Sequence, residues 1–92
     1  MIRSFRCSDT ERLFSGRSVA RFANMRAVAE RKLAMLDAAT SVADLRVPPG
    51  NRLERLAGDR AGQHSIRIND QFRICFRWGD DGPEAVEIVD YH

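Results

Sequence analysis

The stretch V-P-P-G at positions 47–50 divides the chain into two halves with different hydrophobic periods. Two prolines and a glycine cannot continue a helix, because proline lacks a backbone donor and clashes with the preceding turn. Before this stretch the apolar residues recur at helical spacing, and after it they alternate with polar residues as in strands. The sequence therefore predicts helices first and strands afterwards, which is typical of an α+β fold.

The first half carries one long helical pattern, from residue 18 to about residue 40. Its apolar residues fall on one stripe: Phe22, Met25, Val28 or Ala29, Leu33 and Leu36. The opposite side carries Arg21, Arg26, Arg31 and Asp37. These arginines form either a solvated face or a surface that lies against RNA.

Shorter elements flank this helix. S-D-T-E at 8–11 has the spacing of a capping box, in which Ser8 caps a short helical turn and Glu11 reaches back. I-R-S-F-R at 2–6 predicts a short strand, and S-V-A-D-L at 41–45 predicts another helical turn.

The second half carries strand-like runs at 52–56, 63–68, 72–78 and 84–91. They are separated by G-D-R-A-G, N-D-Q and G-D-D-G-P, which are rich in turn-forming residues. We therefore expect one α+β domain spanning residues 1–92, with a twisted, mainly antiparallel sheet and an N-terminal strand and two helices packed on it.

The second and third strand-like runs predict their own register. A slip of one residue would turn a whole apolar set away from the helices, so the apolar sets must stay together. The register that achieves this pairs Ile66 with Ile74. It also places Arg67 opposite Arg73 on the open face, away from the helices.

Two arginines directly opposite each other on a strand pair repel. A carboxylate such as Glu54 or Glu87 would relieve that repulsion. The other relief is an anion from outside, since a phosphodiester between two guanidinium groups would accept charge-assisted hydrogen bonds. The pattern leaves open whether the face binds an anion or carries a solvated pair.

The chain ends in V-D-Y-H, directly after a strand-like run. Because Val86 and Ile88 favour the core, Tyr91 falls on the open face with the two arginines, and Asp90 and His92 alternate with it. An imidazole with a pKa near neutral is a workable acid for RNA cleavage. The alternative is a frayed tail with no such role.

Composition argues against several classes of protein. No apolar run approaches the about 20 residues of a membrane-spanning helix, and the N-terminus lacks the apolar segment of a signal peptide. No H-x-x-H, C-x-x-C or clustered-carboxylate pattern predicts a metal site. We expect Cys7 and Cys75 to be buried thiols in a reducing cytosol, with a disulfide as the alternative. His64 is interpreted as a partly buried structural histidine.

Charge is unevenly divided. Residues 1–50 carry nine basic and five acidic side chains, and residues 51–92 carry six and eight. Fourteen of the fifteen basic residues are arginine, which binds phosphate bidentately. Nucleotide composition of the gene would produce the same bias, so charge alone indicates nucleic-acid binding only weakly.

Three stretches resemble the HigB branch of the RelE-type toxins, the toxin halves of bacterial type II toxin–antitoxin pairs. They are M-I-R-S-F, N-R-L-E-R-L-A-G-D-R-A-G-Q-H-S-I-R-I-N-D-Q-F-R-I-C-F and the terminal V-E-I-V-D-Y-H. Within this branch the chain is most similar to the GraT-type toxins. The resemblance implies a microbial ribonuclease fold. It also implies cleavage of messenger RNA in the ribosomal A site, without metal or cofactor, by 2′-hydroxyl attack that leaves a 2′,3′-cyclic phosphate.

The resemblance also implies site residues. Arg73 matches the arginine that stabilises charge on the phosphate, and Asp90, Tyr91 and His92 match the terminal residues implicated in positioning and proton transfer. Arg67 lies at or beside a second basic position. The residues expected to contact RNA or its phosphates are Arg67, Glu54, Asn69 and Gln71.

The chain departs from the family pattern in the segment L-E-R-L-A-G. Glu54 stands where the family often has histidine, and Ala57 where it often has lysine. His64 and Phe72 each stand where tryptophan is usual. We therefore expect a slow, weak nuclease. The alternatives are a ribosome- or RNA-binding growth inhibitor with little or no nuclease activity, and a structural partner whose sheet only docks an antitoxin.

The resemblance implies several partners in the cytoplasm. They are a helix-turn-helix antitoxin, the 70S ribosome with its messenger RNA, and operator DNA reached only through the antitoxin complex. No membrane partner is expected.

Overall fold

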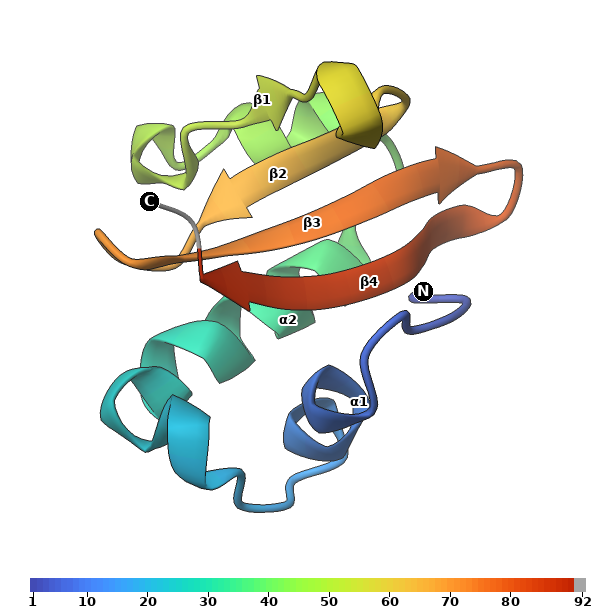
Figure 1. The fold of residues 1–92 in the computed structure, drawn as a ribbon. Coiled ribbons are helices and arrows are strands. Elements are labelled where there is room, and N and C mark those ends of the chain that lie inside the picture. Colours follow the sequence, from blue (N-terminus) through green and yellow to red (C-terminus); the bar gives the residue numbers. More distant parts are fainter. Residues whose placement is uncertain (91–92) are drawn as a thin grey trace.

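The computed structural model of the chain describes residues 1–90, in which the two α-helices lie against one face of a four-stranded sheet (Figure 1). The helical elements, with η for a 3-10 helix, are α1 (Ser8–Phe14), η1 (Ala20–Met25), α2 (Arg26–Ala38), η2 (Val42–Arg46), η3 (Pro49–Asn51) and η4 (Gly58–Arg60). The strands are β1 (Glu54–Arg55), β2 (Gln63–Arg67), β3 (Phe72–Gly79) and β4 (Gly82–Asp90). They lie in the order β1-β2-β3-β4, and every neighbouring pair is antiparallel. The predicted α+β fold is confirmed.

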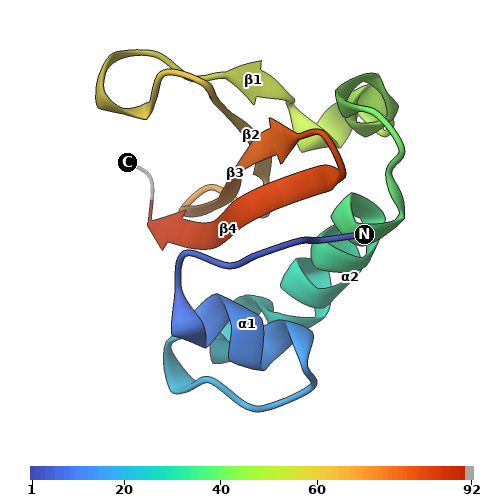
Figure 2. The same ribbon diagram turned by 90° about the vertical axis from the view of Figure 1, so that its right-hand side faces the viewer.

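The core lies between the sheet and the two α-helices, which share one side of it (Figure 2). Its most deeply buried apolar side chains, each exposed by 2% or less, are Leu13, Phe22, Ala29, Leu33, Leu36, Leu45, Ile66, Ile74, Phe76, Val86 and Ile88. The edge of the Phe22 ring packs on Phe72 with ring centres 5.9 Å apart. The apolar stripe that the sequence predicts is therefore the side that α2 buries.

The helix predicted over residues 18–40 is instead two elements, because a 3-10 helix precedes α2. Met25 has φ −127° and ψ 15°, so the α-helical conformation begins only at Arg26. The Arg26 guanidinium donates to the Gly16 carbonyl (3.0 Å) and so holds the preceding loop against the first turn of α2. A 3-10 turn brings residues three apart onto one side, and both Phe22 and Met25 are buried.

The register of the central strands is as predicted. Ile66 pairs with Ile74, and Arg67 pairs with Arg73. The turn between these strands is closed by Asn69, whose Oδ1 accepts hydrogen bonds from the backbone N–H groups two and three residues on, at 2.9 and 2.7 Å. This is the local bonding that favours asparagine in turns.

The segment expected as a strand at 2–6 makes only one parallel bridge, between Phe5 and Val86. Its backbone hydrogen-bonds to β4, including Arg6 N–H to the Val86 carbonyl at 3.0 Å. Irregular pairing of this kind covers the outer edge of β4, which would otherwise offer free ladder groups. The expected strand at 52–56 is likewise reduced to β1, which has two residues.

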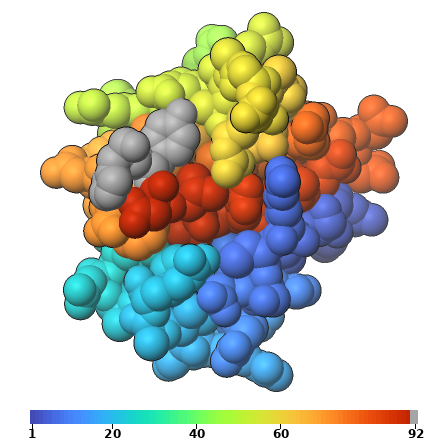
Figure 3. Space-filling view, in the orientation of Figure 1, coloured from blue at the N-terminus to red at the C-terminus, as the bar shows by residue number. Residues whose placement is uncertain are grey.

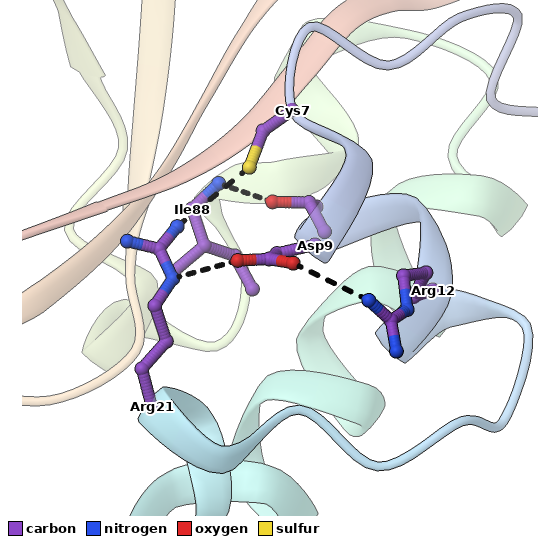
Figure 4. Close-up of polar contacts among 6 residues, drawn as sticks. Cys7, Asp9, Arg12, Arg21 and Ile88 are labelled. Atoms are coloured by element: carbon purple, nitrogen blue, oxygen red, sulfur yellow. Dashed lines mark hydrogen bonds and ion pairs between the residues drawn. The ribbon is translucent and has the colours of Figure 1, made fainter.

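The capping box expected from Ser8 and Glu11 is wrong. Ser8 is already the first helical residue, Cys7 holds the N-cap position, and no side chain caps it. The helix is instead attached through Thr10, which is 0% exposed and whose Oγ1 accepts a hydrogen bond from the Ile88 N–H of β4 at 2.9 Å. On the outer side, Asp9 pairs with Arg21 at 3.2 Å (Figure 4).

Thr10→Val is expected to destabilise the fold by about 1–3 kcal/mol, because it keeps the side-chain shape and leaves the buried Ile88 N–H without its acceptor. Thermal unfolding would show this as a lower Tm. Thr10→Ser retains the hydroxyl oxygen, so it should lower the free energy of unfolding clearly less than Thr10→Val does. Equal losses in the two variants would mean that the methyl packing of Thr10, and not its hydrogen bond, attaches α1.

Candidate active site

The face of the sheet away from α1 and α2 is called here the arginine face; it includes Glu54, Gln63, Ser65, Arg67, Arg73, Cys75 and Glu87. The expectation that this face is open is corrected. Ser65 and Cys75 are 0% exposed and Gln63 is 3% exposed.

The segment containing η4 covers part of the arginine face. Arg60 extends from this segment and pairs with Glu87 of β4 at 2.8 Å, and it also donates to Gln63 Oε1 at 3.1 Å. Figure 3 shows the segment around η4 (yellow) lying against β4 (red). Glu87 is therefore engaged by Arg60, a residue whose sequence context predicts only a turn.

Arg73 is buried on this face, with 9% of its surface exposed. Its Nε donates to Ser65 Oγ at 2.8 Å, and its Nη2 donates to the carbonyls of Arg52 (2.7 Å) and Ser65 (3.4 Å). Arg52 adopts a left-handed conformation with φ 44°, at the end of η3. These three oxygens fix the orientation of the guanidinium plane.

Arg67 lies opposite Arg73, and its guanidinium pairs with Asp70 in the following turn. The acid that relieves the repulsion is therefore Asp70, whereas the strand pattern favoured Glu54 and Glu87. The Asp70 side chain is 100% exposed. Exposed ion pairs contribute about 0–1 kcal/mol, so a phosphate group can replace this carboxylate at little cost.

Lys32, the single lysine of the chain, is buried below this end of the sheet and donates to Asn51 Oδ1. Burial lowers the pKa of Lys32, and the positive charges of Arg31 and Arg67 lower it further. Lys32 therefore acts as a buried structural group that adds to the positive potential near Arg67.

The other predicted site residues are distributed over β1, the β2–β3 turn and the end of β4. Glu54 is exposed on β1 and pairs in register with Ser65, which places it on the arginine face. Asn69 closes the β2–β3 turn, and Gln71 donates to Asp90 Oδ2 at 3.0 Å. Asp90 is in register with Phe72, so its side chain leaves the sheet on the side opposite Arg73. The predicted residues Tyr91 and His92 lie outside the described residues.

Ser65 and Arg52 are site residues that were not predicted from the sequence. A signal for Ser65 existed, because strand alternation puts it beside Arg73 on one face. Nothing in the sequence indicates that the Arg52 carbonyl points at Arg73, since this depends on a left-handed residue after V-P-P-G.

The two cysteines and His64 complete the set of residues that the sequence singles out. Neither cysteine forms a disulfide: Cys75 is buried, and burial raises the pKa of its thiol, while Cys7 is half-buried. His64 stacks on Phe76 with ring centres 5.9 Å apart. Residues 1–90 contain no group of three metal-ligating side chains and no helix of the length and apolarity that crosses a membrane.

A family model described as the RelE-like toxin of the type II toxin–antitoxin system HigB matches residues 3–92. The chain belongs to the HigB family of RelE-like toxins. Toxin HigB-1 from Vibrio cholerae serotype O1 is 56% identical over 50 residues, which are 54% of this chain and 53% of that protein. An uncharacterized protein from Haemophilus influenzae is 40% identical over 55 residues, 60% of this chain and 54% of that protein. This HigB-like chain thus matches about half the length of these curated relatives.

The fold of this HigB-like chain also occurs in a solved structure. A chain of the YoeB-YefM complex from Staphylococcus aureus superposes with a TM-score of 0.63, covering 100% of this chain and 95% of that one. The two are 18% identical, so the likeness concerns the fold alone.

Proposed function

We propose that the chain is the toxin of a type II toxin–antitoxin module and cleaves messenger RNA in the ribosomal A site. The observation that carries the proposal is the Arg73 guanidinium, which Ser65 Oγ and the Arg52 carbonyl fix in position on the same face as Arg67. A preorganised cation of this kind stabilises charge that develops on a phosphate. Membership of the HigB family supports the same reaction.

In the proposed reaction, the 2′-oxygen of one ribose attacks the adjacent phosphorus, and the bond from phosphorus to the next 5′-oxygen breaks. The products end in a 2′,3′-cyclic phosphate and a 5′-hydroxyl. One proton leaves the 2′-hydroxyl and one reaches the 5′-oxygen. Arg73 stabilises the extra negative charge on the phosphorane, and Arg67 binds a neighbouring phosphate after releasing Asp70.

Proton transfer is assigned to the end of the chain and to Glu54. His92 and Tyr91 are the proposed acid and positioning groups, and Asp90 orients the terminus. Glu54, on the arginine face, is the proposed base that accepts the proton of the 2′-hydroxyl. The ribosome holds the message in place, and proximity then supplies much of the rate.

The proposed partners follow from the toxin role. The toxin is neutralised by a helix-turn-helix antitoxin, acts on 70S ribosomes in the cytoplasm, and reaches operator DNA only through the antitoxin complex. Family membership supports the antitoxin partner.

A ribosome- or RNA-binding growth inhibitor without cleavage is the second candidate function. It is favoured by Ala57, which stands at the start of η4 where the resemblance implies a lysine. Without that cation one phosphate has no partner, so we expect weak cleavage at best.

The test is primer extension on a defined message in a purified translation reaction. The wild type should cut at the A-site codon only when ribosomes are present, and the upstream fragments should carry a 2′,3′-cyclic phosphate. Deletion of His92 should lower cleavage by about 100-fold or more, the usual contribution of a positioned acid. Translation that stops without any cut would replace the nuclease by the binding function.

A further inference from the structure

A cavity of about 430 Å³ lies beside β1 and η2, outside the proposed active site. Its lining residues are Val42, Arg46, Leu53, Arg55 and His64. Small-molecule and nucleotide sites have volumes of roughly 300–1,000 Å³, so one nucleotide fits this space.

The register of β1 places this cavity on the other side of the sheet from Arg73. Glu54 pairs with Ser65, and Arg55 pairs with His64. Because neighbouring residues of a strand point to opposite faces, Arg55 and His64 leave the sheet on the side opposite Ser65. The cavity and the arginine face therefore share one border, the edge strand β1.

The cavity is positively charged. Arg46 and Arg55 are exposed, and neither makes an ion pair or a side-chain hydrogen bond with any residue from 1 to 90. Within residues 1–90, no carboxylate belongs to its lining. The acid of η2, Asp44, is turned to Thr40, whose N–H it accepts at 2.9 Å. By contrast, Arg21, Arg26, Arg60 and Arg67 all pair with carboxylates.

The floor of the cavity suits a flat ring. Val42 and Leu53 supply apolar surface, and His64 is stacked on Phe76 and thus held in one orientation. Burial and the charge of Arg55 lower the pKa of His64, so the imidazole is mainly neutral at pH 7. A neutral ring beside cations is the usual arrangement for stacking a base while its phosphate is bound.

We propose that this cavity binds one nucleotide of a single-stranded RNA segment, with its phosphate on Arg46 and Arg55 and its base against His64. The inference rests on the proposed function, because it extends the RNA path from the arginine face over β1. Because β1 has two residues, the edge that RNA would cross between the arginine face and the cavity is short.

The experiment measures binding of a fluorescein-labelled, single-stranded 2′-O-methyl RNA dodecamer by anisotropy at several KCl concentrations. The methyl groups block 2′-oxygen attack, so the wild-type toxin can be used. Arg46→Gln/Arg55→Gln should weaken binding by about 10-fold or more and reduce the slope of log Kd against log salt by about 0.7 for each phosphate that is no longer bound. Arg6→Gln/Arg17→Gln removes the same charge from exposed positions elsewhere and should change Kd less than twofold.

Equal effects of the two double variants would overturn the proposal. So would unchanged RNA affinity combined with weaker capture of the co-expressed antitoxin, which would assign the cavity to protein.

Binding of the Arg46→Gln/Arg55→Gln variant to message-free and to programmed 70S ribosomes then identifies the RNA. Weaker binding to both indicates ribosomal RNA, and weaker binding only to programmed ribosomes indicates the message. Failure of the proposed nuclease is a separate result, because it is read from A-site cuts by the wild type.

Discussion

Replacing Arg73 with alanine is expected to lower ribosome-dependent cleavage by about 100- to 1,000-fold, the usual loss when a preorganised donor to a developing oxyanion is removed. Arg73 has 9% of its surface exposed and is oriented by Ser65 and the Arg52 carbonyl, so its charge is already in place before the message binds. The measurement is single-turnover cleavage on programmed ribosomes.

Two variants separate the charge of Arg73 from its orientation. Arg73→Lys keeps the charge and loses the planar fork, so cleavage should stay at least about 10-fold below wild type. Ser65→Ala keeps the guanidinium and removes the acceptor of its Nε. It should reduce the cleavage rate less than Arg73→Ala and leave ribosome affinity unchanged, because Ser65 acts as a positioning residue.

Arg17→Ala is the matched control, since Arg17 is exposed on the helical side of the protein. It should cleave at the wild-type rate. Each variant is first checked by thermal unfolding, because Arg73 also contributes buried hydrogen bonds. A folded Arg73→Ala toxin that cleaves within threefold of the wild type would remove Arg73 from the chemistry.

The sequence predicts which strand residues face each other in the site, because strand alternation is a local pattern. The pairing of Ile66 with Ile74 follows from keeping apolar residues on one side, and the pairing of Arg67 with Arg73 then follows without further information. The change of period at V-P-P-G likewise predicts the order of helices and strands. These features depend on the type and spacing of residues alone.

The sequence does not predict which groups surround those arginines. The contact from Arg60 to Glu87 joins residues 27 positions apart, and it depends on how η4 folds over the sheet. The acid beside Arg67 is Asp70, three positions away, yet a strand pattern points across the sheet and not along the turn. Loop conformation and tertiary contacts decide both, and neither leaves a periodic signal.

Arg73 and Arg67 are therefore held in place by different groups. Arg73 is oriented by Ser65 Oγ and the Arg52 backbone carbonyl, which are fixed parts of the fold. Arg67 is held by an exposed carboxylate, which a phosphate can replace. The first arrangement suits stabilisation of a transition state, and the second suits reversible binding of the message.

Asn51→Ala is expected to destabilise the fold by about 1.5–3 kcal/mol, the usual contribution of a hydrogen bond to a charged group. Asn51 is 0% exposed and joins η3 to α2: its Oδ1 accepts from Lys32, and its Nδ2 donates to the Leu45 carbonyl at 3.1 Å. Alanine leaves a buried ammonium without this acceptor. Chemical denaturation measures the free energy of unfolding, with the exposed Asn24→Ala as the matched control, which should cost less than about 0.5 kcal/mol.

The charge of Lys32 makes the free energy of unfolding depend on pH. Because burial lowers the pKa of Lys32, the folded protein binds fewer protons than the unfolded chain at pH values between the two pKa values. The contribution of Lys32 to stability is therefore least favourable at low pH and improves as pH rises through this range, which chemical denaturation at several pH values would measure.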